Sequence, residues 1–209
     1  MRRVKGKQVL ELGPEGFSAV RAGYGQLILD IGTGDGKHAL AVARDRPDAL
    51  VVGLDAAKDN LRKVSARSEP GNLVFLWCPV EQLPAELAGI DELHVLMPWG
   101  SLLRGLLGEP PQLLADLAAR CRTGARFLVT LNLHAWRPPV PEVGAAPEPR
   151  PDSVALREHY AAAGWVIERA WYPDTAELAA LSTSWTRRLN SSRDELAVLA
   201  VAGEIRPPG

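Results

Sequence analysis

The chain has few cysteines, no long apolar run and little net charge, and each shortage excludes a class of protein. Only two of its 209 residues are cysteines, Cys78 and Cys121. They form no C-x-x-C pair, so the sequence indicates neither a disulfide framework nor a zinc site. No apolar run is long enough to cross a bilayer, and residues 1–13 contain no apolar signal core. We therefore expect one cytoplasmic domain over residues 1–209 that does not bind membranes.

The charges nearly cancel, at a formal net charge of -1, which argues against nucleic-acid binding through bulk electrostatics. Three short segments are nevertheless basic. Each alone is typical of a solvated face, whereas all three on one surface would form a footprint for phosphate groups. The four histidines are far apart without metal-ligand spacing, so we expect no metal site. The basic segments contain Arg2, Arg3, Lys5 and Lys7; Lys58, Arg62, Lys63 and Arg67; and Arg187, Arg188 and Arg193.

The most informative stretch joins an apolar run to a glycine-rich turn. Residues 27–31 are typical of a buried parallel strand, and the apolar spacing after Lys37 is typical of the inner face of a helix. Glycines at such a turn let the backbone approach a ligand, while the helix N-terminus offers unpaired N–H groups. The next apolar run, 50–54, ends on Asp55. An acid about 20 residues after the turn can bind the two hydroxyls of a ribose, so this unit is predicted to bind a nucleoside.

The spacing of the glycines indicates which nucleoside. A dinucleotide fingerprint needs a third glycine where Lys37 stands, and a phosphate loop needs a hydroxyl where His38 stands. The pattern present, D-x-G-x-G-x-G from Asp30 to Gly36, resembles motif I of class I S-adenosylmethionine (SAM) methyltransferases. SAM has no phosphate, so its loop needs no cation, and a nearby acid suits its ammonium group. A glycine turn without a ligand is the alternative, which the placement of Asp30 and Asp55 disfavours.

Periodicity along the rest of the chain predicts a class I SAM-dependent methyltransferase fold, an α/β (Rossmann-like) architecture. Seven core strands with helices between most of them would form a doubly wound, mostly parallel sheet. A hairpin and a short helix (1–24) precede it, a proline-rich loop covers 134–151, and a loop with tryptophan and arginines (182–194) joins the last two strands. The expected strands are 27–31, 50–54, 72–78, 91–97, 125–133, 165–171 and 195–202, with helices after Lys37 and over 58–68, 110–122, 151–163 and 174–181.

Among the six tryptophans, Trp99 and Trp185 are singled out because both fall in predicted loops. Because open α/β sheets bind ligands beyond the carboxyl ends of their strands, Trp99 would present an aromatic plane at the site of chemistry. Two facing loop tryptophans would suit a base held between rings, since stacking contributes roughly 1–3 kcal/mol per base and offsets the cost of flipping it out. From composition alone, the alternative that both tryptophans only pack within the protein is equally well supported. Trp77, Trp165 and Trp171 fall in or at the ends of strands, and we expect them in the core.

Three segments carry a specific resemblance to a known family: 94–105 (HVLMPWGSLLRG), 132–138 (NLHAWRP) and 183–188 (TSWTRR). They resemble the Kam branch of the Kam/Npm family of aminoglycoside-resistance methyltransferases, and the similarity runs from Arg2 to the last strand. That family methylates N1 of a decoding-site adenine, adenine 1408, in 16S ribosomal RNA. The resemblance implies the same activity here, with SAM as cofactor and 16S rRNA in the assembled small (30S) subunit as partner. We expect a monomer.

The resemblance also implies roles for particular residues. Trp99 and Trp185 would sandwich the flipped adenine, and Thr183 would border the reaction site. Contacts with SAM are implied for Asp30, Gly32, Asp55 and Glu81, and we add their neighbours Thr33, Gly34, Ala56 and Val80, and Pro98. Glu81 would accept a hydrogen bond from the adenine amine of SAM, and a solvated loop residue is the alternative. Contacts with rRNA are implied for Lys63, Arg188 and Arg193, to which we add Arg2, Arg3, Lys5, Arg67 and Arg187.

The chemistry of adenine N1 needs little from the protein. Its lone pair is nucleophilic at neutral pH, so we expect catalysis by proximity and orientation, worth up to roughly 7–11 kcal/mol, without a general base. The segment 97–99 (MPW) replaces an Asn/Asp-Pro-Pro-aromatic motif, which fits a ring nitrogen better than an exocyclic amine. Two alternatives remain. A methyltransferase acting on a small molecule or another RNA would keep the pocket without needing both tryptophans plus arginines, and a non-catalytic SAM-binding regulator would differ only in an activity assay.

Overall fold

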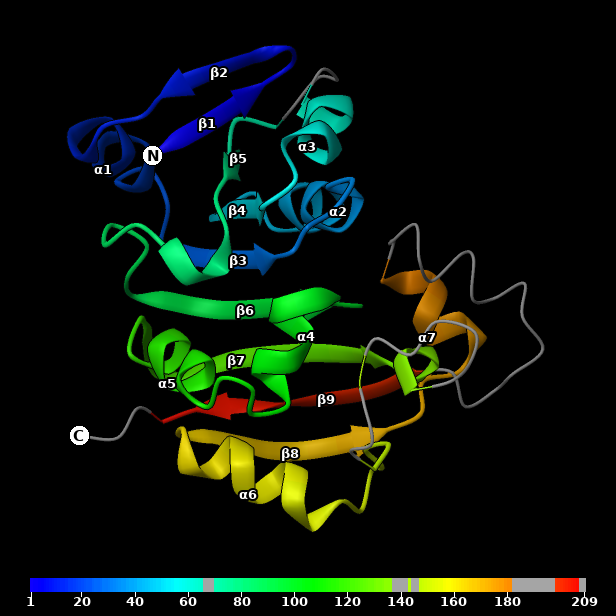
Figure 1. Cartoon of the computed structure of the whole chain (residues 1–209). Coiled ribbons are helices and arrows are strands. Elements are labelled where there is room, and N and C mark those ends of the chain that lie inside the picture. Colours follow the sequence, from blue (N-terminus) through cyan, green and yellow to red (C-terminus); the bar gives the residue numbers. More distant parts are fainter. Residues whose placement is uncertain (66–69, 137–142, 144–146, 182–197, 207–209) are drawn as a thin grey trace.

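The computed structural model describes residues 1–65, 70–136, 143, 147–181 and 198–206. Within these residues a single nine-stranded sheet runs through the molecule in the order β2-β1-β5-β4-β3-β6-β7-β9-β8 (Figure 1). Its strands are β1 (Arg2–Lys5), β2 (Gln8–Glu11), β3 (Gln26–Ile31), β4 (Ala49–Asp55), β5 (Leu73–Trp77), β6 (Ile90–Leu96), β7 (Cys121–Asn132), β8 (Trp165–Trp171) and β9 (Val198–Ile205).

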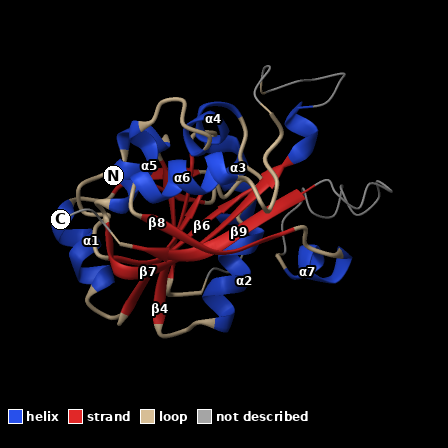
Figure 2. Cartoon of the chain, turned by 90° about the horizontal axis from the view of Figure 1, so that it is seen from below, coloured by secondary structure: helices blue, strands red, loops and turns tan. Residues whose placement is uncertain are grey.

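Helices cover both faces of the sheet. In Figure 2, α4 (Gly100–Leu106), α5 (Gln112–Ala118) and α6 (Val154–Ala162) lie on one side of the strands and α2 (Lys37–Asp45) on the other. No helix in the described ranges is long and apolar enough to cross a membrane. The remaining helices are α1 (Pro14–Arg21), α3 (Lys58–Ser65), α7 (Thr175–Ala180) and the short 3-10 helices η1 (Val80–Gln82) and η2 (Leu133–Trp136).

Two apolar clusters hold these layers together, because the side chains of the central strands alternate between the faces. Leu27, Leu29 and Ile31 of β3 belong to the larger cluster, which also contains residues of α1, α4, α5 and α6. Ile28 belongs to the smaller cluster, with residues of α2 and α3. A strand buried on both faces reads as a continuous apolar run, which is why the sequence predicted this strand correctly.

The sheet is larger and less parallel than the sequence predicted. The strands β5, β4, β3, β6 and β7 pair in parallel, but the pairings β1–β2, β1–β5, β7–β9 and β8–β9 are antiparallel. The N-terminal hairpin was expected ahead of a seven-stranded sheet. Instead it continues the sheet, since Val4 of β1 is in register with Phe75 of β5. Val4 is buried, so burial of one apolar residue accompanies the edge pairing.

The helix α4 was not predicted from the sequence, because 97–100 were expected in a loop and the next helix was expected to begin at 110. Glycine inside a helix costs about 1 kcal/mol relative to alanine, so Gly105 lowers the helix propensity of this segment. Packing explains its presence: a Cβ on Gly105 would lie 2.2 Å from Cδ2 of Leu113 in α5. The close approach of α4 to α5 thus requires a glycine. The predicted helix 110–122 was too long, since α5 ends at Ala118.

Both long C-terminal strands also extend beyond their predicted bounds. Thr123 and Gly124 were expected to form a turn, but they lie within β7 beside a register shift against β6. Gly124 has a φ of 83°, so the glycine serves an irregularity of the strand rather than a reversal of the chain. Residues from 203 onward were expected to form a tail. Instead β9 continues to Ile205, which pairs with Trp165 of β8.

Of the three tryptophans expected in the core, only Trp165 is fully buried. Trp77 and Trp171 are partly exposed, and each has an arginine guanidinium over its ring, Arg2 at 3.8 Å and Arg169 at 3.9 Å from the ring centroid. These two tryptophans end their strands, where one face of the ring remains at the surface. The expectation of core packing was therefore wrong for both.

Candidate active site

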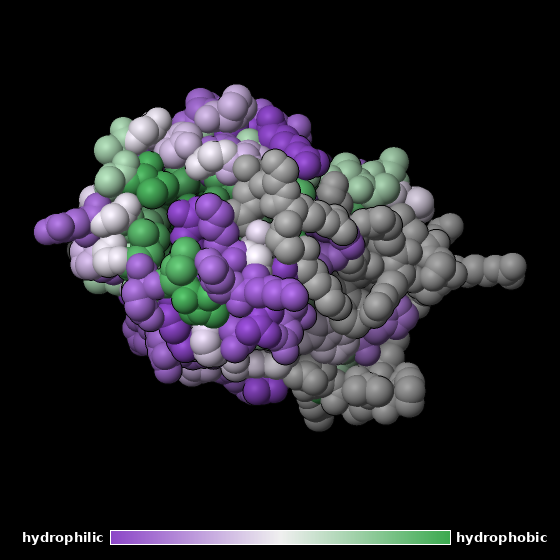
Figure 3. All heavy atoms as spheres, turned by 90° about the horizontal axis from the view of Figure 1, so that it is seen from above, coloured by the Kyte–Doolittle hydropathy of each residue, from purple (hydrophilic) through white to green (hydrophobic). Residues whose placement is uncertain are grey.

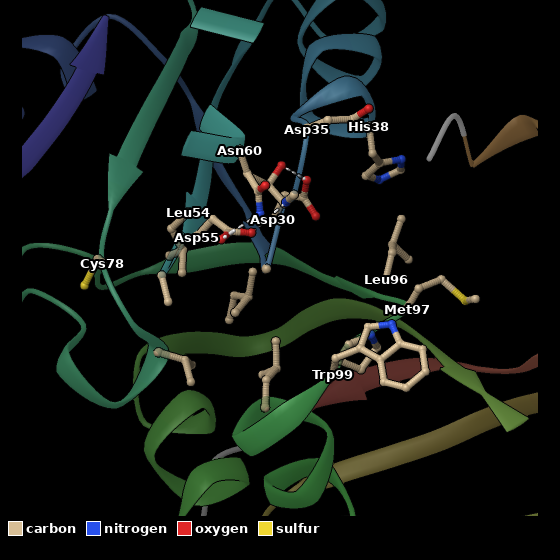
Figure 4. A pocket seen from close by; sticks show the side chains of 18 of the residues that line it. Asp30, Asp35, His38, Leu54, Asp55, Asn60, Cys78, Leu96, Met97 and Trp99 are labelled. Atoms are coloured by element: carbon tan, nitrogen blue, oxygen red, sulfur yellow. Dashed lines mark hydrogen bonds between the residues drawn. The ribbon is translucent and has the colours of Figure 1, made fainter. Parts of the chain in front are cut away.

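A cavity of about 660 Å³ lies where β3, β4, β5 and β6 end at their carboxyl edge (Figure 4). Open α/β sheets bind ligands at this edge. The cavity brings together all the residues predicted to contact the cofactor and one of the two loop tryptophans: Asp30, Gly32, Thr33, Gly34, Asp55, Ala56, Val80, Glu81, Pro98 and Trp99. Its wall also contains residues that the sequence analysis did not select, among them Asp35, Lys37, His38, Asn60 and Cys78.

The glycine turn after β3 has the conformation that its sequence predicts. Gly32 and Gly34 have φ values of 68° and 57°, in the left-handed region that residues with a Cβ rarely adopt. A Cβ on Gly34 would meet only a backbone oxygen of its own turn, at 3.9 Å. Gly36 differs, because its Cβ would lie 2.6 Å from Val64 and 2.7 Å from Phe75. The first two glycines therefore shape the cavity, whereas Gly36 permits packing beneath it.

The two acids at this edge have different surroundings. Asp30 is 2% exposed, and its Oδ2 accepts a hydrogen bond of 2.5 Å from the hydroxyl of Thr33. Asp55 is half-buried and accepts from the backbone N–H groups of Gly34 (2.8 Å, to Oδ2) and Ala57 (2.7 Å, to Oδ1). Asp55 thus ties the end of β4 to the glycine turn. The side-chain amide of Asn60 also donates to Oδ1, at 3.5 Å. Because a carboxylate oxygen can accept about two hydrogen bonds, Oδ2 retains capacity for a ribose hydroxyl.

The segment after β6 contains the backbone outlier of this site. Met97 has a φ of 53° although it is not a glycine, a conformation that costs on the order of 1–3 kcal/mol and persists where the surroundings impose it. Its N–H donates to both the carbonyl oxygen and the hydroxyl of Thr130 in β7, at 3.0 Å each. The chain then turns through Pro98 to Trp99, which lines the cavity and precedes α4.

Two histidines that are far apart in the sequence meet beside the cavity. Nε2 of His38 lies 2.9 Å from Nδ1 of His94, and Nδ1 of His38 lies 2.8 Å from the carbonyl oxygen of Leu181. Their separation in sequence concealed the contact, since His38 begins a helix and His94 lies in β6. Among the described residues, no group of three or more His, Cys, Asp and Glu side chains is arranged to hold a metal ion.

Two of the three basic segments lie side by side at the hairpin end of the sheet. β1 carries Arg2, Arg3 and Lys5 and contacts α3, which carries Lys58. Arg2 and Lys58 both approach the ring of Trp77, with Nζ of Lys58 at 4.8 Å from its centroid. Seen from this end, the described surface is largely hydrophilic, with apolar residues gathered in smaller areas (Figure 3).

Several predicted site residues lie outside the described residues. They include the second loop tryptophan, so the structure does not place it relative to Trp99. The last described residue before the segment 182–197 is Leu181, directly after α7. Outside the described residues are Arg67, Thr183, Trp185, Arg187, Arg188 and Arg193, and the side chain of Lys63 is likewise not described.

A glycine turn after β3, an acid at the end of β4 and a cavity at the carboxyl edge are the features of class I SAM-dependent methyltransferases. The comparisons identify the branch. A model of the NpmA family, described as 16S rRNA (adenine(1408)-N(1))-methyltransferase, matches residues 2–204. The chain therefore belongs to this family.

Relatives of known name match almost the whole chain. A 16S rRNA (adenine(1408)-N(1))-methyltransferase of Streptoalloteichus hindustanus is 55% identical over 216 residues, covering 99% of this chain and 100% of that protein. The crystal structure of the 16S rRNA methyltransferase KamB has a TM-score of 0.94 at 54% identity and covers 99% of this chain and 100% of that one. A variant of the corresponding enzyme from Catenulisporales acidiphilia, solved with its cosubstrate SAM, has a TM-score of 0.83 at 33% identity and covers 100% of this chain and 98% of that one.

Proposed function

We propose that this protein transfers the methyl group of SAM to N1 of adenine 1408 of 16S rRNA in the 30S subunit, and thereby confers aminoglycoside resistance. The observation that carries the proposal is the cavity at the carboxyl edge of a chain that matches the family over residues 2–204. Its lining includes every residue selected from the sequence as a SAM contact. A monomer working in the cytoplasm, where ribosomal subunits are found, completes the proposal.

The residues of the cavity suit the parts of SAM. Asp55 offers carboxylate oxygens to the ribose hydroxyls, and the carboxylate of Asp30 lies near the glycine turn, where an ammonium group would be attracted. Glu81 lines the cavity from η1 with an exposed side chain, and we assign it to the adenine amine. The left-handed turn at Gly34 leaves room for a ligand to approach the backbone. When bound, SAM supplies an electrophilic methyl group on a sulfonium.

The methyl transfer moves charge without moving a proton. The bond from N1 to the methyl carbon forms as the bond from sulfur to that carbon breaks, so the positive charge passes from the sulfonium to the adenine ring. An aromatic face attracts a cation by about 0.5–2 kcal/mol. Trp99 can therefore both orient the base by stacking and stabilise the charge that develops on it. We assign the matching role on the other face of the base to Trp185, with Thr183 beside the reacting atoms.

Recognition of the rRNA is assigned to the basic residues. Arg2, Arg3 and Lys5 on β1 lie beside α3, which also carries Lys63. Arginines at 187, 188 and 193 and Arg67 complete the proposed phosphate contacts. Because the net charge is only -1, such binding would depend on this local concentration of charge, and it would weaken steeply with added salt.

Primer extension tests the proposal directly. Purified protein is incubated with SAM and 30S subunits, and reverse transcriptase is then run across the decoding site, where N1 methylation blocks base pairing. We expect a stop at adenine 1408 that requires both SAM and protein. Methylation of naked 16S rRNA or of another nucleotide would favour a different RNA substrate. SAM binding without any transfer would favour the non-catalytic regulator, and either result would refute the proposal.

A further inference from the structure

His38 connects the candidate SAM cavity to the last described residue before 182–197. The imidazole is 9% exposed and lines the cavity from the first turn of α2. In the view of Figure 4, Leu96 and Met97 lie between His38 and Trp99. Nδ1 of His38 lies 2.8 Å from the carbonyl oxygen of Leu181. A carbonyl oxygen can only accept a hydrogen bond, so Nδ1 is the donor and carries a proton.

An apolar contact accompanies this hydrogen bond. Leu178 of α7 forms a small buried cluster with Met97 and Val198, and Leu181 packs against it. Apolar contacts are not directional, so this cluster alone does not fix the orientation of the Leu181 carbonyl. The hydrogen bond from His38 is directional, so it fixes the orientation of this carbonyl group. Together the two contacts fix the point from which the chain continues into 182–197.

The histidine pair and Glu92 form a chain of hydrogen bonds that requires three protons. Nε2 of His38 lies 2.9 Å from Nδ1 of His94, and Nε2 of His94 lies 2.8 Å from Oε1 of Glu92. With the bond to Leu181 this makes three hydrogen bonds, and each needs one proton. Two neutral imidazoles carry one proton each on nitrogen. The complete chain therefore holds one proton more than two neutral rings and a carboxylate.

With Glu92 ionised, the hydrogen bonds of the chain place a proton on both nitrogens of His94. Burial lowers the pKa of His38, against the raising influence of the Asp30 carboxylate. The hydrogen bond from His94 lowers the pKa of Glu92, whose other oxygen lies 3.2 Å from the guanidinium of Arg46. Within the described residues, the charged groups facing the pair are thus Asp30 of β3, Glu92 of β6 and, through Glu92, Arg46 directly after α2. His38 is the neutral ring, which donates through Nδ1 and accepts at Nε2.

We infer that His38 is a positioning residue for the methyl transfer, holding Leu181 beside the cavity most firmly while the histidine pair keeps its third proton. The inference rests on the proposed function, in which residues after Leu181 contact the adenine. When the third proton leaves at higher pH, three hydrogen bonds must share two protons. The carboxylate of Glu92 retains the Nε2 proton of His94, because hydrogen bonds to ionised groups are the stronger ones. One proton then remains for the two bonds made by His38, so it is shared between Leu181 and His94 and the bond to Leu181 weakens.

Two amide substitutions at His38 distinguish its hydrogen bond to Leu181 from its hydrogen bond to His94. Asparagine places its amide nitrogen near the position of Nδ1, and glutamine places its amide nitrogen near that of Nε2. We expect His38→Gln, which loses the donor to Leu181, to lower kcat for 30S methylation about tenfold, with a smaller change in KM. His38→Asn should retain most of the rate but lose its pH dependence. His159→Gln is the control, since His159 is a half-buried histidine on α6 that does not line the cavity. Equal rates for both His38 variants and the wild type would overturn the inference.

The pH profile and histidine NMR provide independent readouts. The wild-type rate should fall at high pH, where the third proton is lost, and Glu92→Gln should move that fall to lower pH, because it removes the carboxylate that accepts from Nε2 of His94. In ligand-free protein, 15N NMR should show His38 protonated on Nδ1 and His94 protonated on both nitrogens. Two neutral rings at every pH above about 6 would overturn the inference even in an active enzyme and even if His38→Gln does not fold. A wild type that shows the expected NMR pattern but never methylates would refute the proposed function and the positioning role, while the proton count would stand.

Discussion

At the scale of single residues, the site depends on side chains that serve the fold and the ligand together. The position of Asp55 at the end of β4 was predictable, because apolar runs and the spacing from the glycine turn locate it. Its two hydrogen bonds to the backbone N–H groups of Gly34 and Ala57 were not, since they depend on how the turn folds back. The His38–His94 contact was hidden for the same reason: 56 residues separate the partners. Local patterns identify candidates, but only the tertiary structure shows what they touch.

Replacing Asp55 should therefore affect both SAM binding and stability. Asp55→Ala removes the proposed ribose acceptor and should weaken SAM binding by about ten- to a hundredfold, as expected for a charge-assisted hydrogen bond worth about 1.5–3 kcal/mol. It also leaves two backbone donors without their acceptor, so the melting temperature should fall. Asp55→Asn keeps one carbonyl acceptor and should lie between alanine and wild type. Titration calorimetry and thermal unfolding measure the two effects, and an unchanged SAM affinity would contradict the assignment.

Substitutions of Trp99 test the stacking role when folding is measured in the same variants. The ring is half-buried and also packs against the main apolar cluster, so loss of activity alone would not distinguish stacking from stability. We expect Trp99→Phe to retain part of the aminoglycoside resistance of expressing bacteria, because an aromatic face remains, and Trp99→Ala to abolish it. The same series at Trp185 should give the same order. SAM affinity and unfolding are measured in parallel. Alanine variants that fold, bind SAM and still confer resistance would exclude the sandwich.

At the scale of elements, the sequence predicted the buried strands better than the helix that follows the site. β3 and β4 are apolar apart from Gln26 and two acids, Asp30 and Asp55, and their type and position were clear. α4 begins at Gly100 and contains Gly105, so its local sequence argues against a helix, and only the contact with α5 explains it. β9 pairs with β7 at eight positions, from Asn132 with Val198 to Ala125 with Ile205, and so continues three residues past its predicted end at 202. Because strand formation depends on packing against neighbouring strands, local composition alone does not set this end.

Gly105→Ala separates helix propensity from packing. Propensity alone predicts a gain of about 1 kcal/mol in the free energy of unfolding. Packing predicts a loss, because the new methyl group would lie 2.2 Å from Cδ2 and 3.0 Å from Cβ of Leu113, and overpacking typically costs about 1–3 kcal/mol. We expect the loss to prevail. Urea unfolding measures it, with the exposed Ser101→Ala in the same helix as control. A more stable Gly105→Ala would mean that Leu113 moves aside at little cost.

At the scale of the whole molecule, the site and the proposed RNA-binding surface come from different parts of one sheet. The cavity lies at the carboxyl edge of the parallel strands, whereas Arg2, Arg3 and Lys5 lie on the hairpin that continues the sheet past β5. Sequence analysis identified the basic segments but could not bring two of them together, because their proximity depends on the β1–β5 pairing and the contact of β1 with α3.

Charge reversal tests this separation of surfaces. Lys5→Glu combined with Lys58→Glu should weaken binding to 30S subunits severalfold and reduce the dependence of binding on salt, since each lost phosphate contact lowers the slope of log K against log salt by roughly one. SAM affinity should not change, because neither residue lines the cavity. Arg206→Glu, an exposed position beyond the end of β9, is the matched control. Filter binding across a salt series measures the effect. Equal slopes of log K against log salt for the double variant and the control would mean that these lysines do not contact the rRNA.

The pairing of β1 with β5 also bears on self-association. Without the hairpin, β5 would be an edge strand whose residues Leu73, Val74, Phe75 and Leu76 are all apolar. Unprotected apolar edges of this kind recruit strands from other molecules and aggregate. On this side of the complete sheet the outermost strand is β2, a short exposed strand in which Gln8 and Glu11 flank the apolar Val9 and Leu10. The hairpin that carries the basic residues is therefore also a cap, and insertions that loosen it would be expected to produce aggregates before they affect methyl transfer.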